Sequence, residues 1–227
     1  MLRHADREYE TELDALREQL LLMAAKVEQA LEQAMTAFER GQPELAQQVI
    51  VDDEQIDRLE KDIDGMALRI LAKRQPVASD LRFVATTLKV VTDLERIGDL
   101  GVNIAERVVE LGSLPKPIDR HSIPRIAEAA LGMLHDALDS YVAADADKAE
   151  QVIVRDATVD AYYAQLFHEL VAEMATNPGT TEWVTRLQSI GKYLERVADH
   201  ATNLAEMVVF MVKGEDVRHT GKTDLQP

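Results

Sequence analysis

Thirteen residues occur twice along this chain in nearly the same form. LERIGDLGVNIAE occupies residues 94–106 and LERVADHATNLAE occupies residues 194–206, and seven of the thirteen positions are identical at a constant numbering offset of 100. A second pair, QVIVDDEQID at 48–57 and QVIVRDATVD at 151–160, follows at an offset of 103. Two matching segments in the same order predict a tandem duplication of one structural unit.

The apolar residues of each unit follow a helical period. They recur at alternating steps of three and four, first over residues 13–37 and then in two further stretches, and no strand-like alternation is present. Gly and Pro break the pattern at 40–44 and 74–80, and a segment with three prolines at 112–124 is typical of a linker. The sequence therefore predicts an all-α fold of two tandem three-helix bundles, residues 9–112 and 122–213, with a polar C-terminal tail at 214–227.

Composition excludes several classes of function. The 227 residues include 41 acidic and 25 basic ones, and the net charge of −16 would repel nucleic acid and anionic lipid. The absence of Cys excludes disulfides and thiolate metal sites. The first residues are charged throughout, unlike a signal peptide, and the longest apolar run, Leu20–Ala25, is too short to cross a bilayer. We expect a soluble cytoplasmic protein that does not insert into membranes.

The repeated polar residues share one face of a helix. At 100° per residue, Glu95, Asp99, Asn103 and Glu106 fall within an arc of about 80°. Small neighbours such as Gly98 would let another helix approach closely, so these carboxylates are expected at a helix–helix seam. The full set comprises four positions in each copy and an acidic pair in each second helix: Glu95, Asp99, Asn103, Glu106, Glu195, Asp199, Asn203, Glu206, Asp53, Asp57, Asp156 and Asp160.

Two interpretations of these acids compete. Most acidic helix faces are simply solvated, but exposed ion pairs contribute only about 0–1 kcal/mol, which gives little reason to keep residue identity in both copies. Two carboxylates 4 Å apart repel by about 4 kcal/mol at an effective dielectric of 20, so crowded acids must take up protons or a cation. Oxygen-only donors favour Mg²⁺, Mn²⁺, Fe or Ca²⁺. We predict metal at Glu95, Asp99, Glu195 and Asp199, with Asp53, Asp57, Asp156 and Asp160 as weaker candidate ligands.

Signatures of catalysis are missing from the sequence. The chain has no Glu-x-x-His pair of a di-iron carboxylate bundle, no phosphate-binding glycine loop and no nucleophile elbow. No side chain stands out as a general base or nucleophile, so we expect no enzyme, no catalytic residues and no organic cofactor. Three hypotheses remain: a non-enzymatic regulator, a metal-dependent enzyme or metal store that uses the same carboxylates, and a helical adaptor without metal.

The doubled LERIGD and LERVAD, each followed by Asn, and the segment AKRQPVASDLR at 72–82 resemble the PhoU family over nearly the whole chain. The resemblance implies paired three-helix bundles, often dimeric. It also implies cytoplasmic negative regulators of the phosphate-starvation response, which link the ATPase of a phosphate ABC transporter to a sensor histidine kinase. Family members can carry multinuclear iron or zinc clusters on Glu/Asp-x-x-x-Asp motifs, which here match Glu95/Asp99 and Glu195/Asp199. The second copy has Ala198 where the first has Gly98, a change expected to affect helix packing more than ligation.

Overall fold

The computed structural model describes residues 2–112 and 122–217, and every regular element in these ranges is helical. The first repeat contains α1 (Leu2–Arg40), α2 (Pro43–Asp52), α3 (Glu54–Arg74) and α4 (Ala78–Gly112). The second repeat contains α5 (Ile123–Ala143), α6 (Ala146–Thr176), the short 3₁₀ helix η1 (Pro178–Thr180) and α7 (Thr181–Lys213). The predicted all-α duplicated fold is confirmed. Residues 113–121 of the expected linker and residues 218–227 of the expected tail lie outside the described ranges.

The helix boundaries follow from local backbone chemistry. Gly41, at φ 63°, ends α1, and Pro43 then opens α2, where a missing N–H costs no helical hydrogen bond. Ala144 ends α5 in the left-handed conformation, and the Asp145 carboxylate accepts a 3.0 Å hydrogen bond from Lys148 N to cap α6. These short connections fold each repeat into antiparallel rods.

The second rod differs between the repeats. In the first repeat it is interrupted at Asp53, which separates α2 from α3, whereas α6 is continuous. Asp53 keeps helical angles (φ −58°, ψ −32°), so the interruption is local and the three-rod arrangement is preserved. Each repeat is thus a three-rod bundle, as the sequence pattern predicts.

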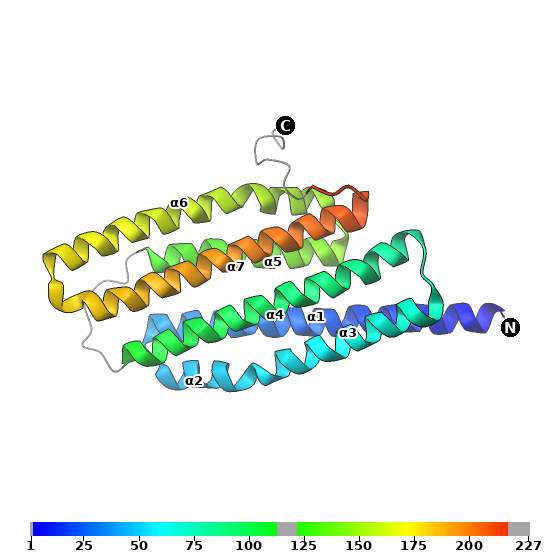
Figure 1. Ribbon diagram of the computed structural model, residues 1–227, viewed down its shortest axis with the longest axis horizontal. Coiled ribbons are helices and arrows are strands. Elements are labelled where there is room, and N and C mark those ends of the chain that lie inside the picture. The colour runs from blue at the N-terminus through cyan, green and yellow to red at the C-terminus, as the bar shows by residue number, and fades with distance from the viewer. Residues whose placement is uncertain (1, 113–121, 218–227) are drawn as a thin grey trace.

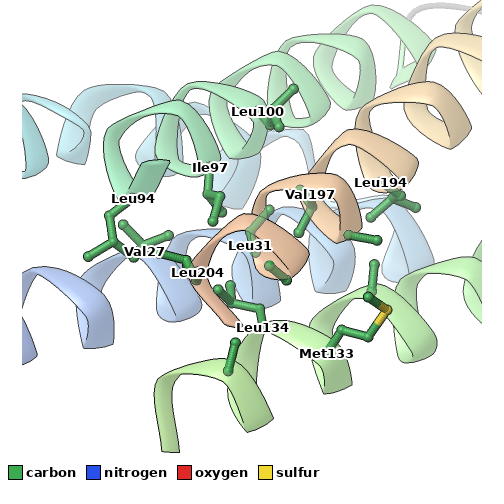
Figure 2. Close-up of a cluster of buried hydrophobic side chains, with 14 of the residues drawn as sticks. Val27, Leu31, Leu94, Ile97, Leu100, Met133, Leu134, Leu194, Val197 and Leu204 are labelled. Carbon is green, nitrogen blue, oxygen red and sulfur yellow. The ribbon is translucent and has the colours of Figure 1, made fainter. Parts of the chain in front are cut away.

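The two bundles lie side by side, with α4 against α7 and α1 against α5 (Figure 1). One hydrophobic core continues from one bundle into the other. Figure 2 shows its centre, where side chains from four helices meet: Val27 and Leu31 of α1, Leu94 and Ile97 of α4, Met133 and Leu134 of α5, and Leu194 and Val197 of α7. The duplicated units are therefore packed against each other through one shared core.

A polar contact breaks the symmetry of the interface between the bundles. Asp93 of α4 is buried, and its Oδ1 lies 2.6 Å from Nδ1 of His200 on α7 and accepts a 3.4 Å hydrogen bond from Asn203 Nδ2. At the offset of 100, the counterparts of Asp93 and His200 are Tyr193 and Leu100. This buried contact helps to fix how the two halves meet, because a buried carboxylate left without a partner is costly.

Candidate metal centres

The first candidate centre lies between α3 and α4. Asp53 immediately precedes α3 and Asp57 lies in its first turn, while Glu95 and Asp99 come from the middle of α4, one helical turn apart. The Glu95 side chain is 18% exposed and that of Asp99 is 43% exposed, so the group is partly buried at Glu95 and open to solvent at Asp99. We call Asp53, Asp57, Glu95 and Asp99 the first carboxylate seam.

The carboxylates of the first seam affect one another's ionisation. Burial raises the pKa of Asp53 to about 6, and the nearby carboxylates of Asp57 and Asp99 add to the rise. The pKa of Glu95 is raised by burial first and then by Asp99, although the guanidinium of Arg96 opposes the rise. Carboxylates crowded in this way favour either protons or a bound cation.

Two further acids, Glu60 and Asp64, join this seam and are not among the ligands predicted from the sequence. Burial, together with Asp64 and Asp57, raises the pKa of Glu60 on α3, and Glu60 in turn contributes to the raised pKa of Glu95. The signal was available, because Asp53, Asp57, Glu60 and Asp64 follow each other at steps of four, three and four on one helix face. At the offset of 103, the counterparts of Glu60 and Asp64 are Tyr163 and Phe167, so the first seam is richer in acids.

The second candidate centre lies between α6 and α7. Asp156 is buried on α6 and Asp160 is exposed one turn further on, while Glu195 and Asp199 come from α7. Although the Asp199 side chain remains partly exposed, partial burial and then the carboxylates of Glu195, Asp156 and Asp160 raise its pKa. The structure therefore brings the predicted ligands together as two separate groups of four, one in each bundle. We call the α6–α7 group the second carboxylate seam.

Each seam contains a cation from its own chain. In the first, Arg96 lies 3.4 Å from Glu95 Oε2 and 3.3 Å from Asp99 Oδ2. In the second, Lys192 Nζ donates to Glu195 Oε2 at 2.6 Å and also lies over the Tyr163 ring. In the described ranges, no three His, Asp or Glu side chains converge closely enough to form a ready-made metal site. A metal ion would therefore require the carboxylates to turn inward and displace Arg96 or Lys192.

Close helix packing supports both seams, as the small residues of the repeat predict. A β-carbon on Gly98 would lie 3.3 Å from two methyl carbons of Ile56 and 3.6 Å from Asp53 Oδ1, so the glycine lets α3 approach α4. In the second repeat the equivalent positions are Val159 and Ala198, both fully buried. Ala198 has one methyl group more than Gly98, and Val159 has one carbon fewer than Ile56. The two changes offset each other in side-chain volume. The close approach in that repeat occurs instead at Gly191, where a β-carbon would overlap Leu166 Cδ2.

Two of the other repeated polar residues have partners outside the seams. Glu106 pairs with the adjacent Arg107 at 3.2 Å, and Asn203 reaches across to Asp93 on α4. His200, which precedes Asn203 on α7, also faces Asp93 rather than the second seam. The helical face of α7 that carries Glu195 and Asp199 thus turns toward the opposite bundle at Asn203.

Comparison with known proteins agrees with this architecture. The sequence model of the PhoU domain matches residues 20–108 and 123–208. A phosphate-specific transport system accessory protein PhoU homolog of Pseudomonas putida is 40% identical over 221 residues, covering 96% of this chain and 86% of the relative. The Escherichia coli phosphate-specific transport system accessory protein PhoU is 34% identical over 98% of this chain and 92% of its own. The chain belongs to the PhoU family.

Solved structures show the same arrangement. The crystal structure of PhoU from Pseudomonas aeruginosa superposes with a TM-score of 0.88 at 38% identity, over 91% of this chain and all of that one. The phosphate transport system regulatory protein PhoU from Streptococcus pneumoniae gives a TM-score of 0.83 at 29% identity, over 92% and 99% of the two chains. These relatives are named as accessory or regulatory proteins and not as enzymes, which confirms the expectation from the missing catalytic signatures. In the described part of the chain no helix has the length and hydropathy to cross a bilayer.

Proposed function

We propose that this protein is a cytoplasmic negative regulator of the phosphate-starvation response, which couples a phosphate ABC transporter to a sensor histidine kinase. The supporting observation is its similarity, along nearly the full chain, to proteins named as accessory to the phosphate-specific transport system. Its partners on this proposal are the transporter ATPase and the kinase. The net charge of −16 would steer it toward basic faces on these partners, so association should slow as salt rises.

Gene deletion and complementation test the regulatory proposal. Cells that lack the protein should express starvation genes, such as a secreted phosphatase, in high phosphate, and the chain should restore repression in an Escherichia coli strain without its own PhoU. Affinity capture from the same cells should recover the transporter ATPase and the kinase. If phosphatase expression stays repressed after deletion and neither partner is recovered, the proposal is wrong.

We further infer that the two seams bind multinuclear iron or zinc. The support is the raised pKa of Asp53, Glu95 and Asp199, which burial causes first and the neighbouring carboxylates increase. A divalent cation relieves this repulsion, and its binding releases protons from the acids whose pKa is raised. The donors fit such ions in chemistry, since carboxylate oxygens bind both, although thiolate and imidazole ligands are absent from the seams. The ion would join α3 to α4 and α6 to α7.

Metal analysis of protein purified without chelator tests this inference. The wild type should contain iron or zinc, and removing the metal should lower its melting temperature. Glu95→Ala with Asp99→Ala should lower the metal content while circular dichroism stays helical, and Glu195→Ala with Asp199→Ala should do the same for the second seam. Asp62→Ala, an exposed acid on α3, is the matched control. A wild type that holds no metal and gains no melting temperature from added iron or zinc would contradict the inference.

A further inference from the structure

A cavity of about 520 Å³ lies between the two bundles, at the end of the molecule where α4 begins and where α5 and α7 end (Figure 1). A cavity of this volume can hold a small molecule. Both repeats contribute to its wall, and no residue of the wall belongs to a carboxylate seam. We call it the end cavity, and the side chains that matter most are Arg17 of α1, Arg82 and Phe83 of α4, Tyr141 and Val142 of α5, and Met211 of α7.

Part of the wall of the end cavity is aromatic and apolar. The rings of Phe83 and Tyr141 are buried, with centroids 6.3 Å apart. The Thr87 hydroxyl donates to Phe83 O at 2.9 Å, so the Tyr141 hydroxyl, 3.3 Å from Thr87 Oγ1, is the donor of that second bond and is satisfied within the protein. Val142 is 58% exposed and Val212 is 37% exposed, so apolar side chains continue from the wall to the surface. Such a wall fits an apolar or aromatic molecule.

Two arginines bring positive charge to the same cavity. Arg82 Nε donates to Met211 O in the last turn of α7 at 3.1 Å, and the two terminal nitrogens of Arg82 make no hydrogen bond or ion pair with the described residues. The guanidinium carbon of Arg17 lies 5.0 Å from the centroid of the Phe83 ring. Its ion pair with Asp14, at 3.1 Å, is exposed to water and therefore weak. Both guanidiniums thus retain the capacity to bind an anion.

The acid in the wall does not neutralise these arginines. Asp80 accepts a hydrogen bond from the Tyr9 hydroxyl at 2.9 Å, and among the described residues it forms no ion pair with Arg17 or Arg82. Two cations therefore share one cavity in a chain whose net charge is −16, and the apolar wall strengthens their attraction for an anion. At the offset of 100, the counterpart of Arg82 is Glu182, so the duplication does not account for this charge.

We propose that the end cavity binds a small organic anion, with its apolar or aromatic body against Phe83 and its oxyanion group at Arg17 and Arg82. Guanidinium groups bind carboxylate, phosphate and similar oxyanions through charge-assisted hydrogen bonds. A bare inorganic anion would leave the apolar wall without a contact, and a neutral apolar molecule would leave the two guanidiniums without one. The proposal does not depend on the transporter or the kinase, so its failure would leave the regulatory proposal standing.

The dye 1-anilinonaphthalene-8-sulfonate is a suitable probe, because it joins an aromatic body to one anionic group and fluoresces when it leaves water. Titration of the folded wild type, followed by fluorescence and calorimetry, should show a single tight site per chain and a melting temperature that rises with dye. Arg82→Gln should weaken binding at least about tenfold and the more exposed Arg17→Gln at least about threefold. Arg58→Gln is the matched control, since Arg58 is an exposed arginine of α3 outside the cavity wall, and it should bind the dye like the wild type.

A neutral probe separates charge from packing. N-phenyl-1-naphthylamine lacks the sulfonate, so Arg82→Gln should leave its affinity unchanged, whereas Val142→Trp, which fills the cavity from an exposed position, should abolish the binding of both probes. Arg82→Gln also loses the bond to Met211 O, so the melting temperatures of the variants without dye are compared first. Arg17→Gln loses no bond between helices among the described residues, and it keeps the test valid if Arg82→Gln is unstable.

Displacement of the dye tests the class of ligand. Phenyl phosphate should displace the dye at a concentration at least about tenfold lower than inorganic phosphate does, because burial of the ring adds to the affinity. Equal displacement by inorganic phosphate would overturn the assignment to an organic anion. Dye binding that both arginine variants leave unchanged would overturn the proposal, since the dye would then lie on another apolar surface. A wild type that binds neither probe would overturn it as well.

Discussion

At the scale of single residues, the chain holds carboxylates where ionisation is unfavourable. Asp53 illustrates the cost: its pKa is raised to about 6 from 3.8 by burial and by Asp57 and Asp99, and its side chain makes no cap hydrogen bond to α3 in return. A carboxylate whose pKa is higher in the folded protein than in the unfolded chain makes the fold less stable as pH rises between those two values. The seam therefore lowers the stability of the metal-free protein at neutral pH.

This cost predicts a stabilising substitution. In protein freed of metal with EDTA, Asp53→Asn should raise the free energy of unfolding at pH 7 by about 1 kcal/mol, once screening by water is allowed for. The gain should shrink as pH falls from about 6 and vanish below about pH 4, where Asp53 is protonated in both states. Urea unfolding at several pH values measures it, with Asp62→Asn as the exposed control. A loss of stability at pH 7 would show that Asp53 is held by contacts other than those described.

At the scale of helices, the two repeats achieve the same close helix packing with different residues. In the first repeat, Gly98 on α4 accommodates the methyl groups of Ile56 on α3, whereas the second repeat has Ala198 and Val159 at the equivalent positions. The volume lost on one helix is regained on the other, so close packing is kept in both. The change from Gly98 to Ala198 thus affects helix packing, as expected from the sequence.

A double-mutant cycle on this pair has a predictable outcome. Ile56→Val alone should cost about 0.5–1.5 kcal/mol through the lost methyl group. Gly98→Ala alone gains up to about 1 kcal/mol of helix propensity but is opposed by about 1–3 kcal/mol of overpacking against Ile56. The double variant copies the second repeat, and it should be at least about 0.5 kcal/mol more stable than the sum of the single changes predicts. Strict additivity, measured by urea unfolding, would mean that the two positions are not coupled.

At the scale of the whole molecule, the continuous core predicts cooperative unfolding. Buried side chains of α4, such as Ile97, and of α7, such as Val197, belong to one cluster (Figure 2), so neither bundle can unfold without exposing the other. Calorimetry of dilute protein should show one transition with equal calorimetric and van't Hoff enthalpies, despite the duplication. Val197→Asp should lower the melting temperature of the entire protein rather than split the transition. Two separate transitions in the wild type would contradict this account.

The sequence determined what depends on neighbours along the chain. Steps of three and four defined the helices, Gly and Pro marked their ends, and the constant offsets of 100 and 103 revealed the duplication. The offsets also placed the acids of the two copies at equivalent positions. Their spacing placed them on one face, since residues three or four apart share a face of any helix. Glu60 and Asp64 could have been added by the same argument.

Only the tertiary structure decided which faces meet. The sequence does not show that α4 packs on α7 or that His200 contacts Asp93, because these contacts join residues about 100 positions apart. Helical periodicity fixes the angular position of a side chain on its own helix, whereas the direction of each face is set by how all the apolar stripes are buried together.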